Sequence, residues 1–273
     1  MLDFTGRHFT KLLILQALRW YLSYPLSYRH VEELMKERGV SVDHSTINRW
    51  VIKYARELEA TFSKKFRKYD AYVSWKMDET YLKHKGKDVY LYRAIDKQGD
   101  TLEFMVSPKR DEKAARKFFK KTIGKHGLPE KVNVDKSGAN EAALLTINIF
   151  LFLLGIWLTH GIEIRQNKYL NNLIEQDHRN IKRLTRPMLG FKAWDSMEST
   201  IAGYELVNMI KKGQHAWNGG IFLLLSETWL DAIELSNPGM SEIIQKSWQG
   251  KIKDQWFERP NKELFKQSRS DSI

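Results

Sequence analysis

Residues 171–183 read Asn-Asn-Leu-Ile-Glu-Gln-Asp-His-Arg-Asn-Ile-Lys-Arg, the stretch around which the rest of the chain is organised. The pattern predicts a helix with one carboxylate near its start, Glu175, and a cation two turns later, Lys182. At about 100° per residue, these two side chains lie within roughly 20° of each other on one helix face. A metal ion bound next to a DNA phosphate needs such a pair. The alternative is a solvated helix on which Glu175 and Arg179 form an ordinary ion pair.

The composition indicates a folded, basic protein. The chain has 273 residues and 42% hydrophobic content, enough for more than one folding unit. Its formal net charge of +12 and its isoelectric point of about 9.6 predict a polyanionic partner, either nucleic acid or an anionic membrane surface. Basic residues exceed acidic ones by 5 in residues 1–70 and by 8 in residues 71–213, whereas residues 214–273 carry one more acidic residue. The polyanion is therefore expected to contact the first two segments.

The absence of cysteine excludes a disulfide scaffold, a thiolate zinc site and a cysteine nucleophile. The first residues show no signal-peptide pattern, so we expect a cytoplasmic protein. The apolar stretch 142–158 is shorter than the roughly 20 residues of a membrane span and lacks flanking anchors. We therefore expect it to be a buried helix of an α/β core, and we expect no membrane partner.

The N-terminal segment predicts three helices. The first covers residues 8–24, and the second covers 28–38 between Ser27 as a cap and Gly39 as a stop. The third opens at Asp43 or His44 and is followed by the basic run 64–68, a linker that is either phosphate-contacting or merely solvated. Two helices joined by a glycine-containing turn are typical of a helix-turn-helix. Any two amphipathic helices on either side of a glycine give the same sequence pattern. The side chains expected to face the major groove are His44, Ser45, Asn48, Arg49 and Lys53.

From residue 71 the apolar pattern changes to that of strands. Residues 72–82, 89–94 and 101–106 are β-rich runs separated by turn sequences, which predicts a three-stranded meander. Five more elements follow: a helix at 112–123 that Gly124 and Gly127 stop, a strand at 131–135, the apolar helix at 140–158, a brief strand at 162–164 and the Glu175 helix at 171–183. This order predicts a ribonuclease-H-like α/β core, an integrase-type core, over residues 71–213 behind an all-α helix-turn-helix domain at 1–70. The tail 214–273 has no clear role, although residues 221–235 have the pattern of an amphipathic helix.

Three acids occupy the positions that a metal site in this fold needs. Asp78 lies in the first strand, Asp135 ends the 131–135 strand and Glu175 opens the late helix. In a ribonuclease-H arrangement the two strands are neighbours and the helix end lies over them, so the three carboxylates converge. Such oxygen ligands suit Mg²⁺ or Mn²⁺. Two ions about 3.5–4 Å apart are expected when DNA is bound.

Several segments resemble those of bacterial insertion-sequence DDE transposases, in particular the insertion-sequence-six family. They are residues 21–29 (YLSYPLSYR), 37–40 (ERGV), 44–50 (HSTINRW), 77–81 (MDETY), 90–96 (YLYRAID) and 168–178 (KYLNNLIEQDH). The resemblance covers about residues 5 to 213, and the last of these motifs is the most specific.

The resemblance implies an enzyme that binds the terminal inverted repeats of its element and catalyses strand cleavage and transfer. It implies that double-stranded DNA, as element ends and as target, is the partner, and that the protein acts as a homo-oligomer on DNA. Asp78, Asp135 and Glu175 match the three metal-binding acids, and Lys182 matches a basic residue that contacts DNA near the cut. Three features depart from the family. Between Asp135 and Glu175 lie 39 residues, more than is usual, and this insert coincides with the 142–158 helix, which is more apolar than in relatives. The tail beyond 213 is longer than expected and does not resemble the family.

Other functions remain open on the sequence. A non-catalytic DNA-binding regulator would use residues 8–60 alone and has no need of three acids and Lys182. A ribonuclease-H-type nuclease acting on RNA or a DNA junction would not need a helix-turn-helix for end recognition. A decayed, inactive transposase copy would keep the motifs without the activity.

Overall fold

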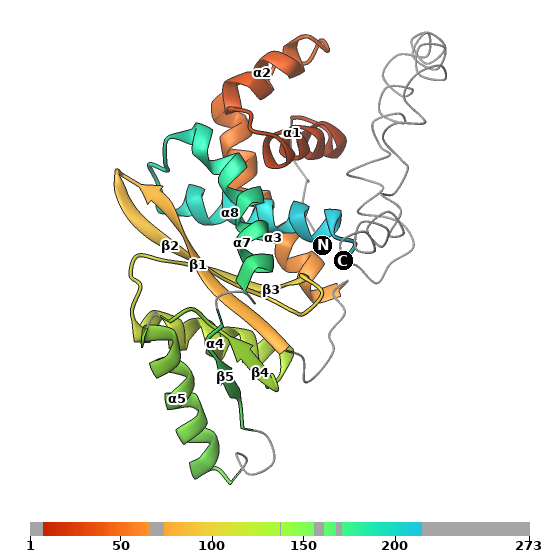
Figure 1. Cartoon of the computed structure of the whole chain (residues 1–273). Helices are drawn as coiled ribbons and strands as arrows, with labels where there is room; N and C mark the ends of the chain where they lie inside the picture. Colours follow the sequence, from red (N-terminus) through yellow and green to blue (C-terminus); the bar gives the residue numbers. More distant parts are fainter. Residues whose placement is uncertain (1–7, 66–73, 137, 156–160, 168–170, 215–273) are drawn as a thin grey trace, which may run out of the picture. The chain divides into compact units, whose positions relative to one another are not determined.

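A computed structural model describes residues 8–65, 74–136, 138–155, 161–167 and 171–214, which all belong to one compact unit spanning Met1–Gly219 (Figure 1). Two expectations from the sequence lie outside these residues. They are most of the basic run at 64–68 and the tail beyond Gln214 with its amphipathic pattern at 221–235.

The centre of the unit is a five-stranded sheet with the order β3-β2-β1-β4-β5 among the described residues. Strands β1 (Ser74–His84), β2 (Lys87–Ile95) and β3 (Thr101–Ser107) form the antiparallel meander that the turn sequences predict. The short strands β4 (Lys131–Asn133) and β5 (Glu163–Arg165) continue the sheet parallel to β1. This order, with helices on both faces, confirms the ribonuclease-H-like fold.

Helices α4 (Glu112–His126) and α5 (Gly138–Leu153) cover one face of the sheet (Figure 1). Their apolar side chains, Phe118 among them, share a buried core with side chains from β1, β2 and β4, including Trp75, Met77, Tyr92 and Val132. The prediction that Gly124 stops α4 is wrong, because the helix continues to Gly127, which has a φ of +79°. A glycine inside a helix costs only about 1 kcal/mol relative to alanine, and the turn beyond it buries His126.

Helices α7 (Asn172–Thr185) and α8 (Trp194–Lys211) lie on the other face, joined by the short 3₁₀ helix η2 (Arg186–Met188). Helix α8 was not predicted from the sequence. Its buried residues include polar ones: Ser199, Thr200, Glu205 and Asn208. They are buried because α8 lies between the sheet and the N-terminal helices.

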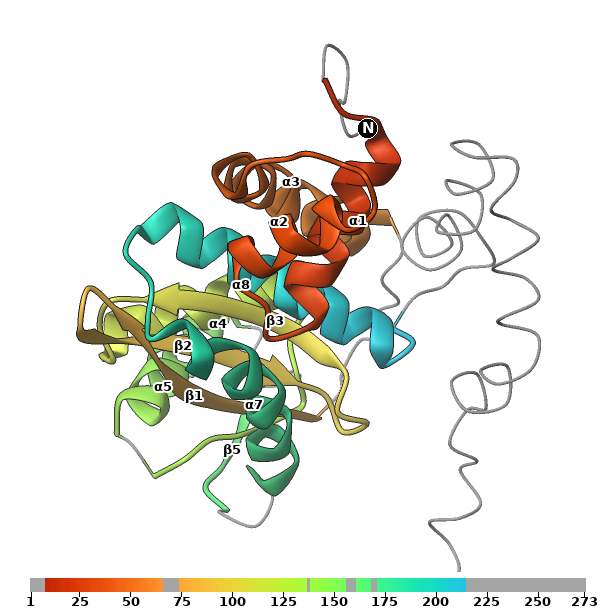
Figure 2. The same ribbon diagram turned by 90° about the horizontal axis from the view of Figure 1, so that it is seen from above.

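The N-terminal helices are α1 (Lys11–Ser23), α2 (Tyr28–Lys36) and α3 (His44–Lys65), as the sequence predicts, although α1 begins three residues later than expected (Figure 2). Ser27 caps α2, and Gly39 has a φ of +76° in the turn before α3. Helix α3 packs along α8, where Ser199 Oγ donates to the carbonyl of Ile52 at 3.1 Å. Helix α1 also approaches α8 closely, since a Cβ on Gly203 would lie 2.5 Å from Leu22 Cδ2.

The expectation that the apolar stretch forms a fully buried helix is wrong. Helix α5 buries Asn140, Ala143, Leu144 and Leu151, but five large apolar side chains on it are 49–74% exposed: Leu145, Ile149, Phe150, Phe152 and Leu153. The reason is that α5 packs against α4 and the sheet on one side only, and its end extends past the strands (Figure 1). Among the described residues, no helix is both long and apolar enough to cross a membrane.

Candidate active site

Two of the predicted acids meet where β1 and β4 lie side by side. Strand β1 pairs with β4 in parallel, with Ser74 opposite Lys131 and Lys76 opposite Asn133. Asp78 lies two residues further along β1, and Asp135 lies two residues beyond β4. Their carboxylate oxygens form a group with those of Glu79 in which all the ligand atoms lie within 4.8 Å of one another.

The third predicted acid, Glu175, lies in the first turn of α7 and is exposed. Burial raises the pKa of Asp78 to about 7, and the negative charges of Glu79, Asp135 and Glu175 add to this effect. Glu175 is therefore close enough to act on Asp78 electrostatically. Its carboxylate does not belong to the 4.8 Å group. The structure thus brings all three predicted acids to one region, with Asp78 and Asp135 in the tighter group.

We call the carboxylates of Asp78, Glu79 and Asp135 the acid cluster. The sequence analysis predicted neither Glu79 nor Arg110, the cation that pairs with this cluster. Arg110 precedes α4 and pairs with Asp135 Oδ2 at 2.5 Å and with Glu79 Oε2 at 3.3 Å. Burial raises the pKa of Glu79, Arg110 opposes that rise and Asp135 adds to it. Glu79 adjoins Asp78 in the quoted motif, which could have drawn attention to it, whereas no sequence pattern places Arg110 at the acids.

The acid cluster fits a divalent metal ion. Carboxylate oxygens are the ligands that Mg²⁺ and Mn²⁺ prefer. Buried carboxylates that raise one another's pKa are unfavourable in the charged form, and a bound cation removes that penalty. His178 lies beside the cluster, with Nδ1 3.7 Å from Asp78 Oδ2. Burial, Arg93 and Lys182 lower its pKa to about 3, so its ring is neutral and supplies no compensating charge.

A second charged cluster fixes the helix that carries Glu175. Arg93 lies opposite Asp78 in the β1–β2 register and is fully buried. Its guanidinium donates to Glu205 of α8 and, at 2.5 Å, to Asp177 of α7, which also pairs with Lys212 at 2.8 Å. Although burial opposes it, the charges of Arg93 and Lys212 hold the pKa of Asp177 at about 2. Because Asp177 lies two residues from Glu175, this cluster holds the start of α7 against the sheet.

Lys182 lies where the helical spacing predicts, on the same face of α7 as Glu175 and close enough to His178 to lower its pKa. Arg179 and Arg186 continue that face at a spacing of four residues from Glu175 and Lys182 respectively. None of these three cations pairs with a carboxylate in the part of the chain that the structure describes.

The five residues predicted to read DNA differ in their surroundings. Ser45 and Arg49 are exposed at the start of α3, and Asn48 and Lys53 are half-buried. His44 is held within the fold, because its Nδ1 lies 2.9 Å from Glu32 Oε2 of α2 and its backbone N–H donates to the same oxygen. Its position therefore serves the junction of α2 with α3, and DNA contact by these residues stays a prediction.

Comparison with known proteins decides the family. A family model described as a DDE domain matches residues 72–214, and a second, described as the IS66 family of transposases, matches residues 8–128. The transposase for insertion sequence-like element IS431mec of Staphylococcus aureus is 41% identical over 211 residues, which cover 77% of this chain and 88% of the relative. The chain belongs to the DDE transposases of insertion sequences. The Staphylococcus aureus transposase for IS257 in transposon Tn4003 matches this transposase with the same identity and coverage.

Among solved structures, the integrase catalytic core domain of HTLV-2 in complex with magnesium is 18% identical to this transposase. That match covers 49% of this chain and 83% of the viral one, with a TM-score of 0.35. The family membership makes the protein a metal-dependent enzyme of polynucleotidyl transfer that acts on DNA. Neither a non-catalytic regulator nor a nuclease acting on RNA is favoured by these matches.

Proposed function

We propose that this transposase belongs to the insertion-sequence-six family, and that it cuts and joins DNA at the ends of its own element. Residues 1–70 bind the terminal inverted repeats, and residues 71–213 catalyse the reaction on the nucleoid in the bacterial cytoplasm. Asp78, Asp135 and Glu175 are the metal ligands in this proposal. The protein works as a homo-oligomer that holds the element ends and the target duplex.

One observation supports the site above all others. Asp78 and Asp135 come from neighbouring parallel strands, 57 positions apart in the sequence, and their oxygens lie in one group within 4.8 Å. Glu175, from a helix on the other side of a long connection, acts on Asp78 electrostatically. This excess of negative charge destabilises the free protein, because carboxylates that are shielded from water are costly unless they are neutralised. It is therefore better explained by a bound cation than by a role in holding the fold together.

The fit of the acid cluster to Mg²⁺ or Mn²⁺ indicates the chemistry. When bound, two such ions would supply the activation of an attacking water or 3′-hydroxyl and the stabilisation of the leaving oxygen. Asp78 and Asp135 would hold the metal beside the middle of β1, and Glu175 would complete the ligand set from α7. Arg93 and Asp177 position Glu175, and the neutral His178 ring keeps water from the buried side of Asp78.

Lys182 is proposed to hold a phosphate of the bound strand near the cut. It lies two helical turns, about 10 Å, from Glu175 on one face of α7. Arg179 and Arg186 extend the positive charge along that face. A DNA strand that lies along α7 thus meets the metal ligands at one end of the helix and cations over the rest of its length.

The proposal is tested by strand transfer with oligonucleotides that carry the inverted repeat found beside the gene. Asp78→Asn, Asp135→Asn and Glu175→Gln should each abolish joining while leaving binding to the repeat within about twofold. Asp195→Asn and Glu163→Gln are matched controls, since both side chains are exposed and lie outside the acid cluster. Joining by any of the three site variants at the wild-type rate would remove that residue from the catalytic set.

The role of residues 1–70 is tested separately on the same repeat. Arg49→Ala should weaken repeat binding by about 1–3 kcal/mol if its exposed guanidinium contacts a base edge. Binding to a scrambled duplex should change much less. An unchanged footprint on the repeat would assign recognition to another element.

A further inference from the structure

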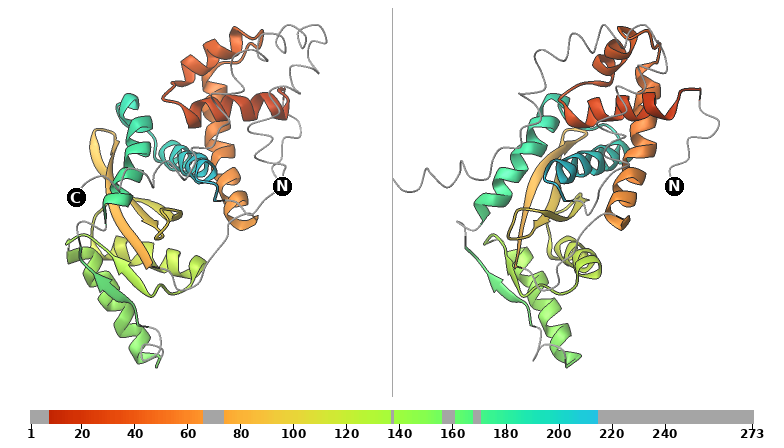
Figure 3. Two further views of the ribbon diagram at one scale, coloured as in Figure 1. Left: turned by 45° about the vertical axis from the view of Figure 1, so that its right-hand side comes forward. Right: turned by 90° about the vertical axis from the view of Figure 1, so that its right-hand side faces the viewer.

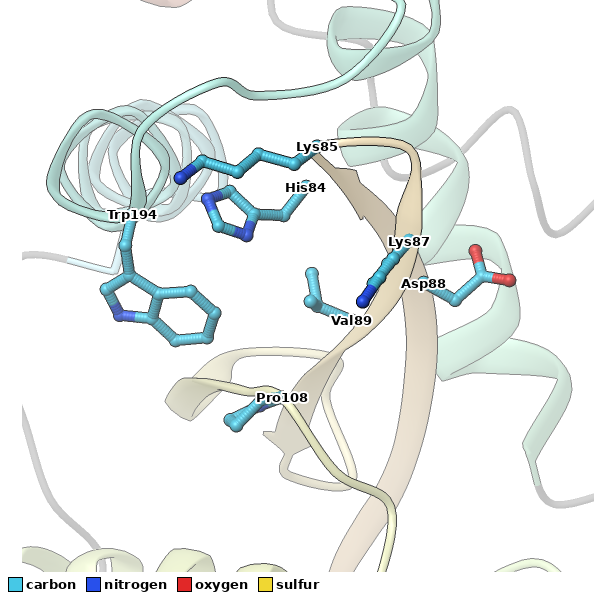
Figure 4. A pocket seen from close by; sticks show the side chains of 7 residues that line it. All are labelled: His84, Lys85, Lys87, Asp88, Val89, Pro108 and Trp194. Carbon is cyan, nitrogen blue, oxygen red and sulfur yellow. The ribbon is translucent and has the colours of Figure 1, made fainter.

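A pocket lies at the tip of the β1–β2 hairpin, apart from the acid cluster. It has a volume of about 500 Å³ and is lined by His84, Lys85, Lys87, Asp88, Val89, Pro108 and Trp194. Figure 4 shows the indole of Trp194 on one side, Val89 and Pro108 on the other, and the side chains of His84 and Lys85 above them. The walls are therefore apolar and aromatic, while the rim is basic.

The hairpin tip is held in place by the segment that connects α7 to α8. The backbone N–H of Phe191 donates to the carbonyl of Lys83, and the N–H of Lys85 donates to the carbonyl of Phe191 at 2.8 Å. Gly190 lets this segment approach, because a Cβ there would lie 2.8 Å from Lys83 Cβ, and its φ is +99°. The ring of His84 meets the edge of Trp194, with 5.5 Å between ring centroids and 89° between planes. The pocket is thus pre-formed.

The positive charge of the rim is not neutralised by the protein. Asp88 points away from the pocket in Figure 4, toward the opposite side of the strand, where it pairs with Lys83 at 2.8 Å. Lys85 and Lys87 are exposed and pair with no carboxylate among the residues described. Two uncompensated ammonium groups beside an aromatic wall suit a nucleotide, with the phosphate at the lysines and the base against the indole.

The pocket lies on the path that a DNA strand at the active site would follow. Asp78 and His84 point to the same face of β1, because six residues separate them and side chains alternate along a strand. At about 3.3 Å per residue, six residues span roughly 20 Å, or about six nucleotides of B-form DNA. Helix α7 packs beside β1 and leads through η2 to the 189–194 segment, which meets the hairpin tip (Figures 1 and 3). Arg179, Lys182 and Arg186 follow Glu175 along this course of the chain.

We propose that this hairpin pocket binds one nucleotide of the DNA strand about six positions from the scissile phosphate, with Trp194 against its base and Lys85 and Lys87 at its phosphate. The inference rests on the proposed function, because it takes the strand to lie along α7. Three duplexes present this chemistry: the element end, the donor DNA that flanks the element, and the target. The pocket does not distinguish them by its chemistry.

Photo-crosslinking tests the contact directly. A single 5-iodouracil is placed at successive positions from two to ten nucleotides on each side of the cut, in terminal-repeat DNA bound to the full chain. Irradiation should cross-link Trp194 at one or two adjacent positions about six nucleotides from the cut. Tyr81, which is 53% exposed on the other face of the hairpin, is the internal control and should not react. Cross-links to Tyr81 in place of Trp194, or to neither residue, would overturn the proposal.

Binding as a function of salt gives an independent measurement. Lys85→Ala combined with Lys87→Ala should lower the slope of log K against log salt by about 0.9 for each lost phosphate contact. Trp194→Ala should weaken binding about tenfold, and Trp194→Phe should restore most of that loss. The double variant Lys113→Ala and Lys117→Ala, on exposed positions of α4, is matched in charge and should leave the slope unchanged. A slope for the hairpin pair equal to that of the wild type would also overturn the proposal.

Three substrates identify the source of the nucleotide. An effect on a pre-cut repeat assigns the pocket to the element end, and an effect only on the uncut repeat assigns it to the flanking DNA. An effect only on an unrelated duplex assigns it to the target. If Asp78→Asn abolishes joining while the hairpin variants match the wild type on all three substrates, the pocket inference fails and the proposed function stands. If Asp78→Asn still joins DNA, the proposed function fails instead.

Discussion

Two charged clusters are built on the neighbouring strands β2 and β1, but they differ in their balance of charge. The first contains Arg93 and Lys212 with Asp177 and Glu205, two cations with two carboxylates, and Arg93 is fully buried. The second contains the carboxylates of Asp78, Glu79 and Asp135 with Arg110 as their cation. Arg93 and Asp78 are even direct partners in the strand register.

The difference shows how structural and functional charges can be told apart. A buried group of equal charges neutralises itself, so it holds α7 and α8 to the sheet and needs no ligand. A group with two carboxylates in excess carries a cost in the free protein, and a divalent cation removes that cost. The first cluster is therefore expected to determine folding, and the second metal binding and catalysis.

The largest expected effect comes from breaking the balanced cluster. Arg93→Met leaves Asp177 and Glu205 as buried charges without their main partner, which costs about 3–5 kcal/mol of unfolding free energy. Urea unfolding measures this loss. Arg165→Met is the control, because it removes a cation from an exposed pair with Glu163 and should leave the urea midpoint unchanged. Equal midpoints for the two variants would mean that the Arg93 cluster does not hold the fold together.

Removing one acid from the unbalanced cluster should raise the free energy of unfolding, whereas breaking the balanced cluster lowers it. The pKa of Asp78 is about 7 in the folded protein against an ordinary 3.8, so its ionisation favours the unfolded chain. The Asp78 carboxylate therefore lowers the free energy of unfolding as pH rises from about 4 to 7. Asp78→Asn should therefore gain stability relative to the wild type across that range, by up to about 4 kcal/mol above pH 7 without metal.

The measurement for Asp78 is the difference between the two unfolding free energies in EDTA at pH 4 to 8. Only the difference is informative, because the neutral His178 acts in the other direction and loses stability as pH falls below its ordinary value of 6.5. A difference that does not grow with pH would show that the fold does not raise the pKa of Asp78, by burial or by the neighbouring carboxylates.

Metal addition should stabilise the protein through the acid cluster and not through the balanced Arg93 cluster. Mg²⁺ or Mn²⁺ at about 100 times its dissociation constant should stabilise the protein by about 2.7 kcal/mol. Asp135→Asn should remove most of this gain, whereas Asp195→Asn, an exposed acid outside the cluster, should keep it. Thermal unfolding with and without metal gives the comparison. An equal metal response in both variants would place the ion elsewhere.

The sequence predicted the parts of the site that depend on local pattern. Asp78 lies within, Asp135 follows and Glu175 opens an element whose period is readable, and the strand order then brings these elements together. The N-terminal helices were predictable for the same reason, because Ser27 and Gly39 mark their ends.

The remaining features depend on contacts between distant residues. Arg110 reaches the acids because its loop folds back over the sheet, and no spacing in the sequence reports that. Helix α8 was missed because its buried face includes Glu205 and Asn208, which are polar and find their partners on β2 and α7. The exposure of α5 was missed for the converse reason, since apolar composition does not reveal that a helix has a neighbour on one side only.

The smallest effect concerns Arg110, the cation that partly compensates the acid cluster. Its side chain is 28% exposed and touches both Asp135 and Glu79, so it occupies two carboxylates that a metal ion would bind. Arg110→Gln should lower stability in EDTA by about 1 kcal/mol, because the closer pair, with Asp135, is about one third exposed to water, which screens it. The same variant should bind Mg²⁺ more tightly, by about fivefold, because the ion no longer competes with a guanidinium. Arg110→Lys keeps the charge and should lie between the two. If Arg110→Gln instead weakens Mg²⁺ binding, Arg110 orients the carboxylates for the ion, and its charge is then part of the assembled site and no longer a competitor for it.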